Sequence, residues 1–135
     1  MANINAWYDQ LESKIFNKVA DYIDSESGED VFCTTDEVNV LDTDFPCVWI
    51  HELEYVERGQ DLKNVTLNGV LYTMQIDVYA LDKSEAKKLM RFAVAKMKAL
   101  KFNVPAMPIT MQISADVYHT VARFRRVIGG LDTIK

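Results

Sequence analysis

A change of hydrophobic period between residues 70–81 and residues 84–100 constrains the fold more than any other feature. In residues 70–81 a core-forming side chain stands at every second position, the pattern of a strand with one face in a core. In residues 84–100 the apolar positions recur at steps of three and four, with basic residues between them, which is typical of an amphipathic helix. Asp82 can cap that helix, and Glu85 can complete a capping box. A sheet with one apolar face and a helix with one apolar stripe bury each other. We therefore expect further strands beside the first and helices on the same side of the sheet.

The core of the predicted domain joins these two segments. The apolar face of the strand should pack on the apolar stripe of the helix. The expected contacts lie among Met74, Ile76 and Val78 of the strand and Leu89, Ala93 and Met97 of the helix.

A second helix and three loops are predicted around this unit. Helical spacing of apolar residues extends over residues 5–24, with Asn3 or Asn5 as the cap. The acidic residues 24–30 and the mixed residues 36–44 are predicted as loops. Residues 57–69 are polar and predict a long hairpin connection that a partner could order.

Four further strands complete the fold. Alternation or β-prone composition predicts strands at residues 31–34, 47–56, 107–114 and 118–128. The third of these should lie at a sheet edge, because it contains Pro108. We therefore predict one α+β domain over residues 1–135, with a mostly antiparallel sheet of four to five strands and two helices packed on one face.

Composition excludes several classes of protein. The 135 residues are 49% hydrophobic and 26% charged, the balance of a globular domain. A formal net charge of −5 argues against general affinity for nucleic acid. No apolar run approaches the roughly 20 residues that span a bilayer, and the first residues lack the pattern of a secretory signal. We expect the protein to be made and used in the cytosol.

The cysteines and histidines show no metal-binding spacing. Cys33 and Cys47 are the only cysteines, and their apolar contexts indicate buried thiols, with a disulfide as the alternative. His51 and His119 are far apart in the sequence, and neither belongs to a ligand-spaced motif. The sequence predicts neither a metal nor a cofactor.

Two charged groups are candidates for chemistry. Glu52 and Glu54 lie near His51, which would suit acid and base catalysis. However, residues two positions apart on a strand share one face, so the simpler interpretation is that both glutamates belong to a charged, solvent-exposed surface. Arg123 and Arg125 share the polar face of the last strand, where they could bind an anion or pair with acids of a neighbouring subunit. The sequence contains no glycine-rich phosphate loop, GxSxG or HExxH motif, so we predict that the protein is not an enzyme.

Several short sequence motifs resemble those of one protein family. They are Phe-Pro-Cys-Val-Trp-Ile at residues 45–50 with the acidic pair after it, the strand that ends in Asp-Val-Tyr-Ala, the lysine- and alanine-rich helix, and Arg-Phe-Arg at residues 123–125. Together they resemble the small tail terminator (tail completion) proteins of long-tailed bacteriophages, over residues 31–128. The chain departs from that pattern after the second helix, where such proteins often carry a Gly-Phe step and this one has Leu-Lys-Phe at residues 100–102.

The resemblance implies a structural virion protein. Such a subunit forms a hexameric ring that caps the tail tube, stops its growth and joins it to the head connector or stopper protein. The ring is assembled in the host cytoplasm, and genomic DNA passes through its lumen without specific binding. Together with the charge pattern, the resemblance indicates Arg123, Arg125, Glu52 and Glu54 as interface residues. The polar composition of residues 57–69 indicates Arg58, Gln60, Asp61 and Lys63 as residues of a partner-binding loop.

Two other functions fit the same residues. One is another head-tail connector or neck component of similar size. The other is a small cytosolic ligand-binding domain or an enzyme. The size of the oligomer separates the two structural functions from the third.

Overall fold

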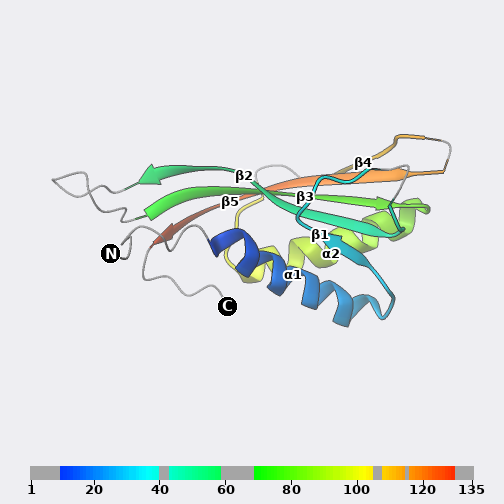
Figure 1. The fold of residues 1–135 in the computed structure, drawn as a ribbon, viewed down its shortest axis with the longest axis horizontal. Helices are drawn as coiled ribbons and strands as arrows, with labels where there is room; N and C mark the ends of the chain where they lie inside the picture. Colours follow the sequence, from blue (N-terminus) through cyan, green and yellow to red (C-terminus); the bar gives the residue numbers. More distant parts are fainter. Residues whose placement is uncertain (1–9, 40–42, 59–68, 105–107, 115, 130–135) are drawn as a thin grey trace.

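A sheet with two helices on one of its faces forms the protein (Figure 1). The computed structural model describes residues 10–39, 43–58, 69–104, 108–114 and 116–129. The elements follow in the predicted order, and the α+β fold class is confirmed. They are α1 (Leu11–Ser27), β1 (Phe32–Thr34), β2 (Cys47–Arg58), β3 (Gly69–Ala80), α2 (Lys83–Ala99), β4 (Ile109–Gln112) and β5 (Tyr118–Gly129).

The sheet has the strand order β1-β2-β3-β5-β4. Strand β3 is central and pairs antiparallel with β2 on one side and with β5 on the other. Strand β4 pairs antiparallel with β5 at one edge, as predicted, but it is shorter than residues 107–114, and Pro108 stands just before it. Strand β1 pairs parallel with β2 at the other edge, which the sequence did not indicate. The sheet is therefore mostly antiparallel, as expected.

The core lies between the sheet and the helices. Every second side chain of β3, from Val70 to Ala80, is fully buried on the helix side, so the predicted alternation is confirmed. The six residues expected to form the strand-helix core belong to one buried cluster, together with the apolar stripe of α1. Those stripe residues are Leu11, Ile15, Val19 and Ile23. Neither described helix has the length and apolar character that crossing a membrane requires.

Helix α1 ends later than predicted. The acidic residues 24–27, expected in a loop, form its last turn, and Gly28 follows with a φ of 66°. Ile23 is buried one turn before the end, so core packing holds this segment helical despite its polar composition. The predicted start, including Asn3 and Asn5, lies outside the described residues.

Asp82 caps helix α2, as predicted, but without the full capping box. The Asp82 carboxylate accepts a hydrogen bond from the backbone N–H of Ser84 at 3.3 Å and another from its hydroxyl at 3.0 Å. These bonds satisfy one amide that would otherwise lack a partner in the first turn.

Helix α2 ends in a turn with a left-handed residue at residues 100–102. The N–H of Phe102 donates to the carbonyl of Met97, and the N–H of Lys101 donates to that of Lys98, which is the Schellman arrangement. It requires a left-handed residue, and Lys101 has a φ of 70°. A lysine therefore occupies the conformation that glycine adopts at lower cost.

This turn leads to a stability prediction. We expect Lys101→Gly to raise the free energy of unfolding by about 1 kcal/mol, because a side chain in the left-handed region costs about that much. The matched control is Lys98→Gly, inside the helix, which should lower stability by a similar amount. Urea denaturation of both variants tests this, and a Lys101→Gly protein less stable than wild type would contradict it.

Candidate functional site

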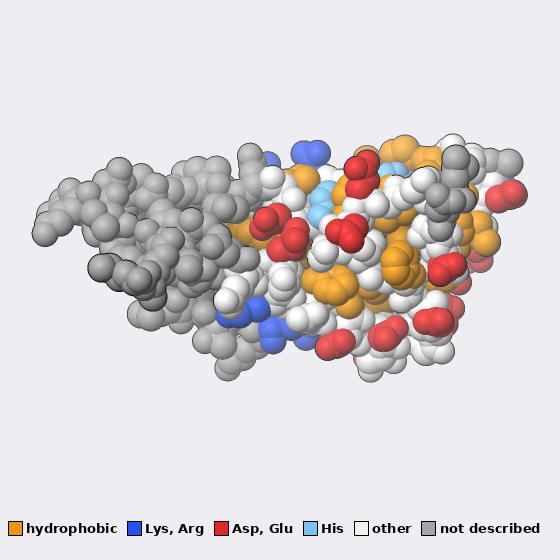
Figure 2. Space-filling model, in the orientation of Figure 1, with side chains coloured by type: hydrophobic (Ala, Val, Ile, Leu, Met, Phe, Trp, Pro, Cys, Tyr) orange, Lys and Arg blue, Asp and Glu red, His pale blue; other side chains and the backbone are white. Residues whose placement is uncertain are grey.

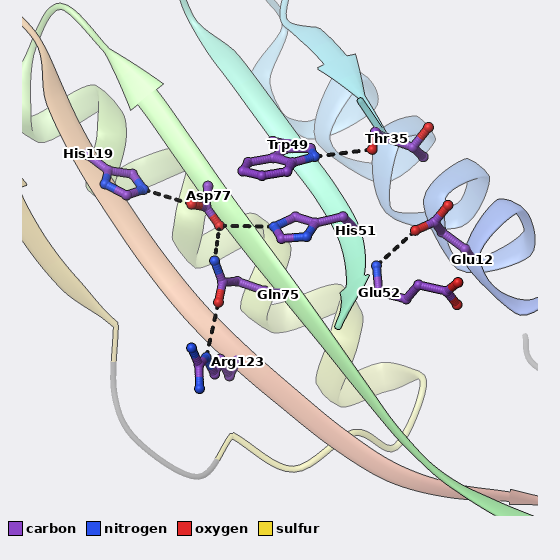
Figure 3. A network of polar contacts seen from close by, with 9 residues as sticks. All are labelled: Glu12, Thr35, Trp49, His51, Glu52, Gln75, Asp77, His119 and Arg123. Carbon is purple, nitrogen blue, oxygen red and sulfur yellow. Dashed lines mark hydrogen bonds and ion pairs between the residues drawn. The ribbon is translucent and has the colours of Figure 1, made fainter. Parts of the chain in front are cut away.

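A polar network crosses β2, β3 and β5 on the sheet face opposite the helices, which we call the open face (Figure 3). Asp77 lies at its centre and is only 4% exposed. Its Oδ2 lies 2.9 Å from Nε2 of His119, and its Oδ1 lies 3.4 Å from Nε2 of His51. The side-chain amide of Gln75 donates to Oδ1 at 2.8 Å. One carboxylate thus binds three partners from three strands.

The strand register brings these side chains together. Asp77 stands opposite Trp49 on β2 and opposite Val121 on β5. His51 and His119 are each displaced by two residues from those positions, so both are diagonal neighbours of Asp77 on the same face. Period-two alternation then directs all three side chains to the open face.

Two aromatic stacks cover the carboxylate. The ring of His51 stacks on Trp49 with centroids 3.7 Å apart and an interplanar angle of 13°. The ring of His119 stacks on Tyr79 at 4.5 Å and 2°. The indole N–H of Trp49 donates to the carbonyl of Thr35 at 3.1 Å, which ties this stack to the segment after β1. These contacts hold both imidazoles in place beside the buried Asp77.

The surroundings of Asp77 favour its charged form. Burial alone would raise its pKa, but hydrogen bonds from His119, His51 and Gln75 outweigh burial and lower the pKa of Asp77 to about 2. The carboxylate is therefore ionised at neutral pH. It can orient the two imidazoles by accepting a hydrogen bond from each.

The arrangement resembles part of a catalytic triad, in which a buried carboxylate orients a histidine. Such chemistry also needs a nucleophile within hydrogen-bond reach of the imidazole. Within the described part of the chain, each imidazole has only Asp77 as a hydrogen-bond partner. The described residues also contain no group of three histidine, cysteine or acidic side chains arranged to hold a metal ion.

The arginines lie on the open face, as the alternation of β5 predicts. Both are exposed, and Arg123 extends the network because its Nε donates to Oε1 of Gln75 at 3.0 Å. Among the described residues, neither Arg123 nor Arg125 forms an ion pair. Both positive charges therefore lie at the surface of the open face.

The expectation that Glu52 and Glu54 share one face is wrong. Glu52 stands opposite Met74, which faces the helices, whereas Glu54 stands opposite Thr73, which faces away from them. A register shift between the two glutamates breaks the alternation. The contacts of Glu52 agree with this placement, because its carboxylate accepts from the hydroxyl of Tyr72 and its N–H donates to Glu12 of α1 at 2.9 Å.

The loop residues predicted to meet a partner are placed only in part. Arg58 is the last residue of β2, and its side chain is outside the described part of the structure. Gln60, Asp61 and Lys63 lie outside the described residues altogether. The predicted loop starts too early, since Glu57 and Arg58 are still in the strand.

The two cysteines are free thiols. Cys33 packs against the core on the helix side, whereas Cys47 belongs to a small cluster with Tyr79 on the open face. A disulfide between opposite faces of a sheet would require the strands to move. Burial, with the charge of Asp24, raises the pKa of Cys33 to about 12, and burial also raises the pKa of Cys47. Both thiols are thus protonated and weakly nucleophilic at neutral pH.

The sequence did not indicate the network around Asp77. It places His119 on the polar face of its strand and His51 in the alternation of residues 47–55, but their meeting depends on how three strands pair. The available signal is Asp77 itself, the only charged residue of the central strand, which requires a polar partner when it is buried.

Comparison with known proteins adds no relative. No protein-family model matches the chain, and a search of curated proteins finds no matching sequence.

Proposed function

We propose that this protein is a ring-forming tail terminator subunit of a long-tailed bacteriophage. It caps the tail tube, stops its polymerisation and joins the tail to the head connector. The resemblance of residues 31–128 to tail terminator proteins supports the proposed identity. The structural observation that supports assembly into a ring is that the two different edges of the sheet both expose apolar side chains.

The edges are suited to contact between copies. Among the described strands, β1 pairs only with β2 and β4 only with β5, so each leaves one side of its backbone without a strand partner. Phe32 on β1 is 47% exposed, and Ile109 and Met111 on β4 are 63% and 47% exposed. Strand edges of this kind promote pairing with another chain. Contact between two different edges is head-to-tail, and it closes into a ring when the rotation between copies allows.

The arginine pair is proposed as a contact with a partner ring or a neighbouring subunit. Arg123 and Arg125 lie side by side on the open face, exposed and without an ion pair among the described residues. The pairing with Glu52 and Glu54 as one acidic surface is not part of this proposal, because the two glutamates occupy opposite faces of the ladder.

The proposed place of the ring in the virion explains the charge of the chain. A net charge of −5 per subunit gives the ring a strong negative excess. Negative charge on the lumen would keep passing DNA from binding to the wall. The flat faces of the ring would then meet the tube and the connector.

Charge reversal of the arginines tests their role. We expect Arg123→Glu with Arg125→Glu to weaken ring assembly or docking to the tube and to leave the subunit folded, because both side chains are exposed. Arg125→Glu alone is the cleaner variant, since Arg123 also binds Gln75. The control replaces both arginines with lysine, which keeps the charge. Light scattering and melting temperature are the readouts, and unchanged assembly and docking of the glutamate variants would contradict the role.

Tube capping tests the function itself. Tubes assembled from the tube protein of the same virus should be shorter or should stop growing when wild-type protein is added. Tubes that grow equally long with and without it would overturn the terminator proposal. They would leave another connector or neck protein as the candidate if the protein forms a ring, and a ligand-binding domain if it does not.

A further inference from the structure

We propose that β4 and the adjoining face of α2 in one subunit dock on an acidic groove beside β1 in a second copy, so that the sheet continues from subunit to subunit. This inference rests on the proposed ring and states which surfaces meet. The inference is supported by two grooves, by two edge strands and by the distribution of charge between them.

The first surface is a groove of about 690 Å³ between α1 and the β1 edge, which we call the acidic groove. Three aromatic residues contribute to its lining: Phe16, Phe32 and Phe45. Four carboxylates surround them, from Asp21, Asp24, Asp30 and Asp44. No described lysine or arginine lines it. Figure 2 shows apolar side chains among acidic ones on the right half of the face that carries α1. The groove therefore fits an occupant that is both apolar and basic.

The second surface lies at the opposite edge, in a groove of about 470 Å³ between α2 and β4. Lys87 and Arg91 of α2 are its charged residues, and no described acidic side chain lines it. Met90, Val94 and Pro108 supply apolar surface beside them. We call this surface the basic edge. Its chemistry complements that of the acidic groove.

The two surfaces match layer by layer. At each end of the molecule a helix lies beside an edge strand, α1 near β1 and β2, and α2 near β4 and β5. When the basic edge of one copy meets the acidic groove of the next, the basic face of α2 approaches the acids of α1. Strand β4 approaches β1 in the same arrangement. In this contact the helix of one copy therefore meets the helix of the next, and the edge strand meets the edge strand.

The exposed apolar side chains also meet. Phe32 stands opposite Cys47 and so shares the open face with it. Thr110 bonds the buried Thr120 at 2.9 Å on the helix side, so its neighbours Ile109 and Met111 point to the open face. In a sheet continued across two copies, all three apolar side chains lie on one face. Their contact would remove apolar surface from water.

The strand directions suit such pairing. Following the pairings across the sheet, β1 runs antiparallel to β4 within one subunit. Copies related by rotation about an axis along the strands therefore place β4 of one antiparallel to β1 of the next, the more stable pairing. The lengths also agree, with three residues in β1 and four in β4.

A mutual-rescue experiment tests the contact. One variant carries Lys87→Glu and Arg91→Glu, and the other carries Asp21→Lys and Asp24→Lys; all four side chains are exposed, so both variants should melt within a few degrees of wild type. Each variant alone brings like charges together, and we expect a six-fold loss of mass, from ring to monomer. Mixed in equal amounts, the two variants should reassemble, since every contact then pairs opposite charges. Native mass spectrometry should find equal numbers of the two chains in each ring, as alternation of the two variants requires.

The outcomes separate this inference from the proposed function. The control, Lys98→Glu with Lys101→Glu, changes two exposed lysines that line neither groove and should leave assembly intact. If wild type forms rings and the Lys87 and Arg91 variant does too, or if mixing restores nothing, the contact is wrong while the ring proposal stands. If wild type never assembles, both fail. Should either double variant fail to fold, Ile109→Asp on the exposed β4 edge takes its place, and rings formed by that variant overturn the contact.

Discussion

Leu89→Ala is expected to destabilise the protein by about 2–5 kcal/mol, the largest effect of any substitution considered. Leu89 is fully buried between α2 and the sheet, in the cluster that contains Met74 and Ile76. Truncation removes apolar contacts and leaves a cavity that the surrounding strand and helix cannot close. Urea denaturation with a single transition would measure the loss.

The matched control is Leu81→Ala. Leu81 lies just after β3 and is 56% exposed, so its truncation should change stability by less than about 0.5 kcal/mol. A similarly small effect at Leu89 would show that the interior has been placed wrongly.

Asp77→Ala should cost about 2–3 kcal/mol, because three donors on the open face lose their shared acceptor. His51, His119 and Gln75 all bind this carboxylate, and the aromatic stacks restrict the water that could replace it. Asp116→Ala is the control, since that aspartate is exposed. Equal losses for the two variants would contradict a central role of the network.

Acid titration tests the same carboxylate independently. The pKa of Asp77 is lowered from 3.8 to about 2 in the folded protein, so ionised Asp77 stabilises the fold above the unfolded pKa. That contribution is lost as pH falls from about 4 to about 2. The stability difference between wild type and Asp77→Asn should therefore shrink over this range. A difference that stays constant down to the lower limit would contradict the assigned pKa.

Local periodicity predicts most of the fold. The alternation of β3 and β5 and the helical stripe of α2 each depend on neighbours in the sequence, and each is confirmed. Composition misplaces the end of α1, because acids and serines favour loops, whereas Ile23 and the left-handed Gly28 place the helix end at Ser27.

What the sequence misses depends on pairing between distant strands. The parallel position of β1 and the register shift between Glu52 and Glu54 have no local signature. Without the register, the glutamates read as one acidic surface and the histidines as unrelated. The network around Asp77 and the charge difference between the two sheet edges arise only when residues from separate elements come together.

The mass of the purified wild-type protein in solution tests the central claim most directly. Light scattering at several protein concentrations, with and without the tube protein, should give a species of six times the 15.4 kDa chain mass, seen as a ring with a central hole in negative stain. A protein that stays at 15.4 kDa under all these conditions and shortens no tubes would contradict the account.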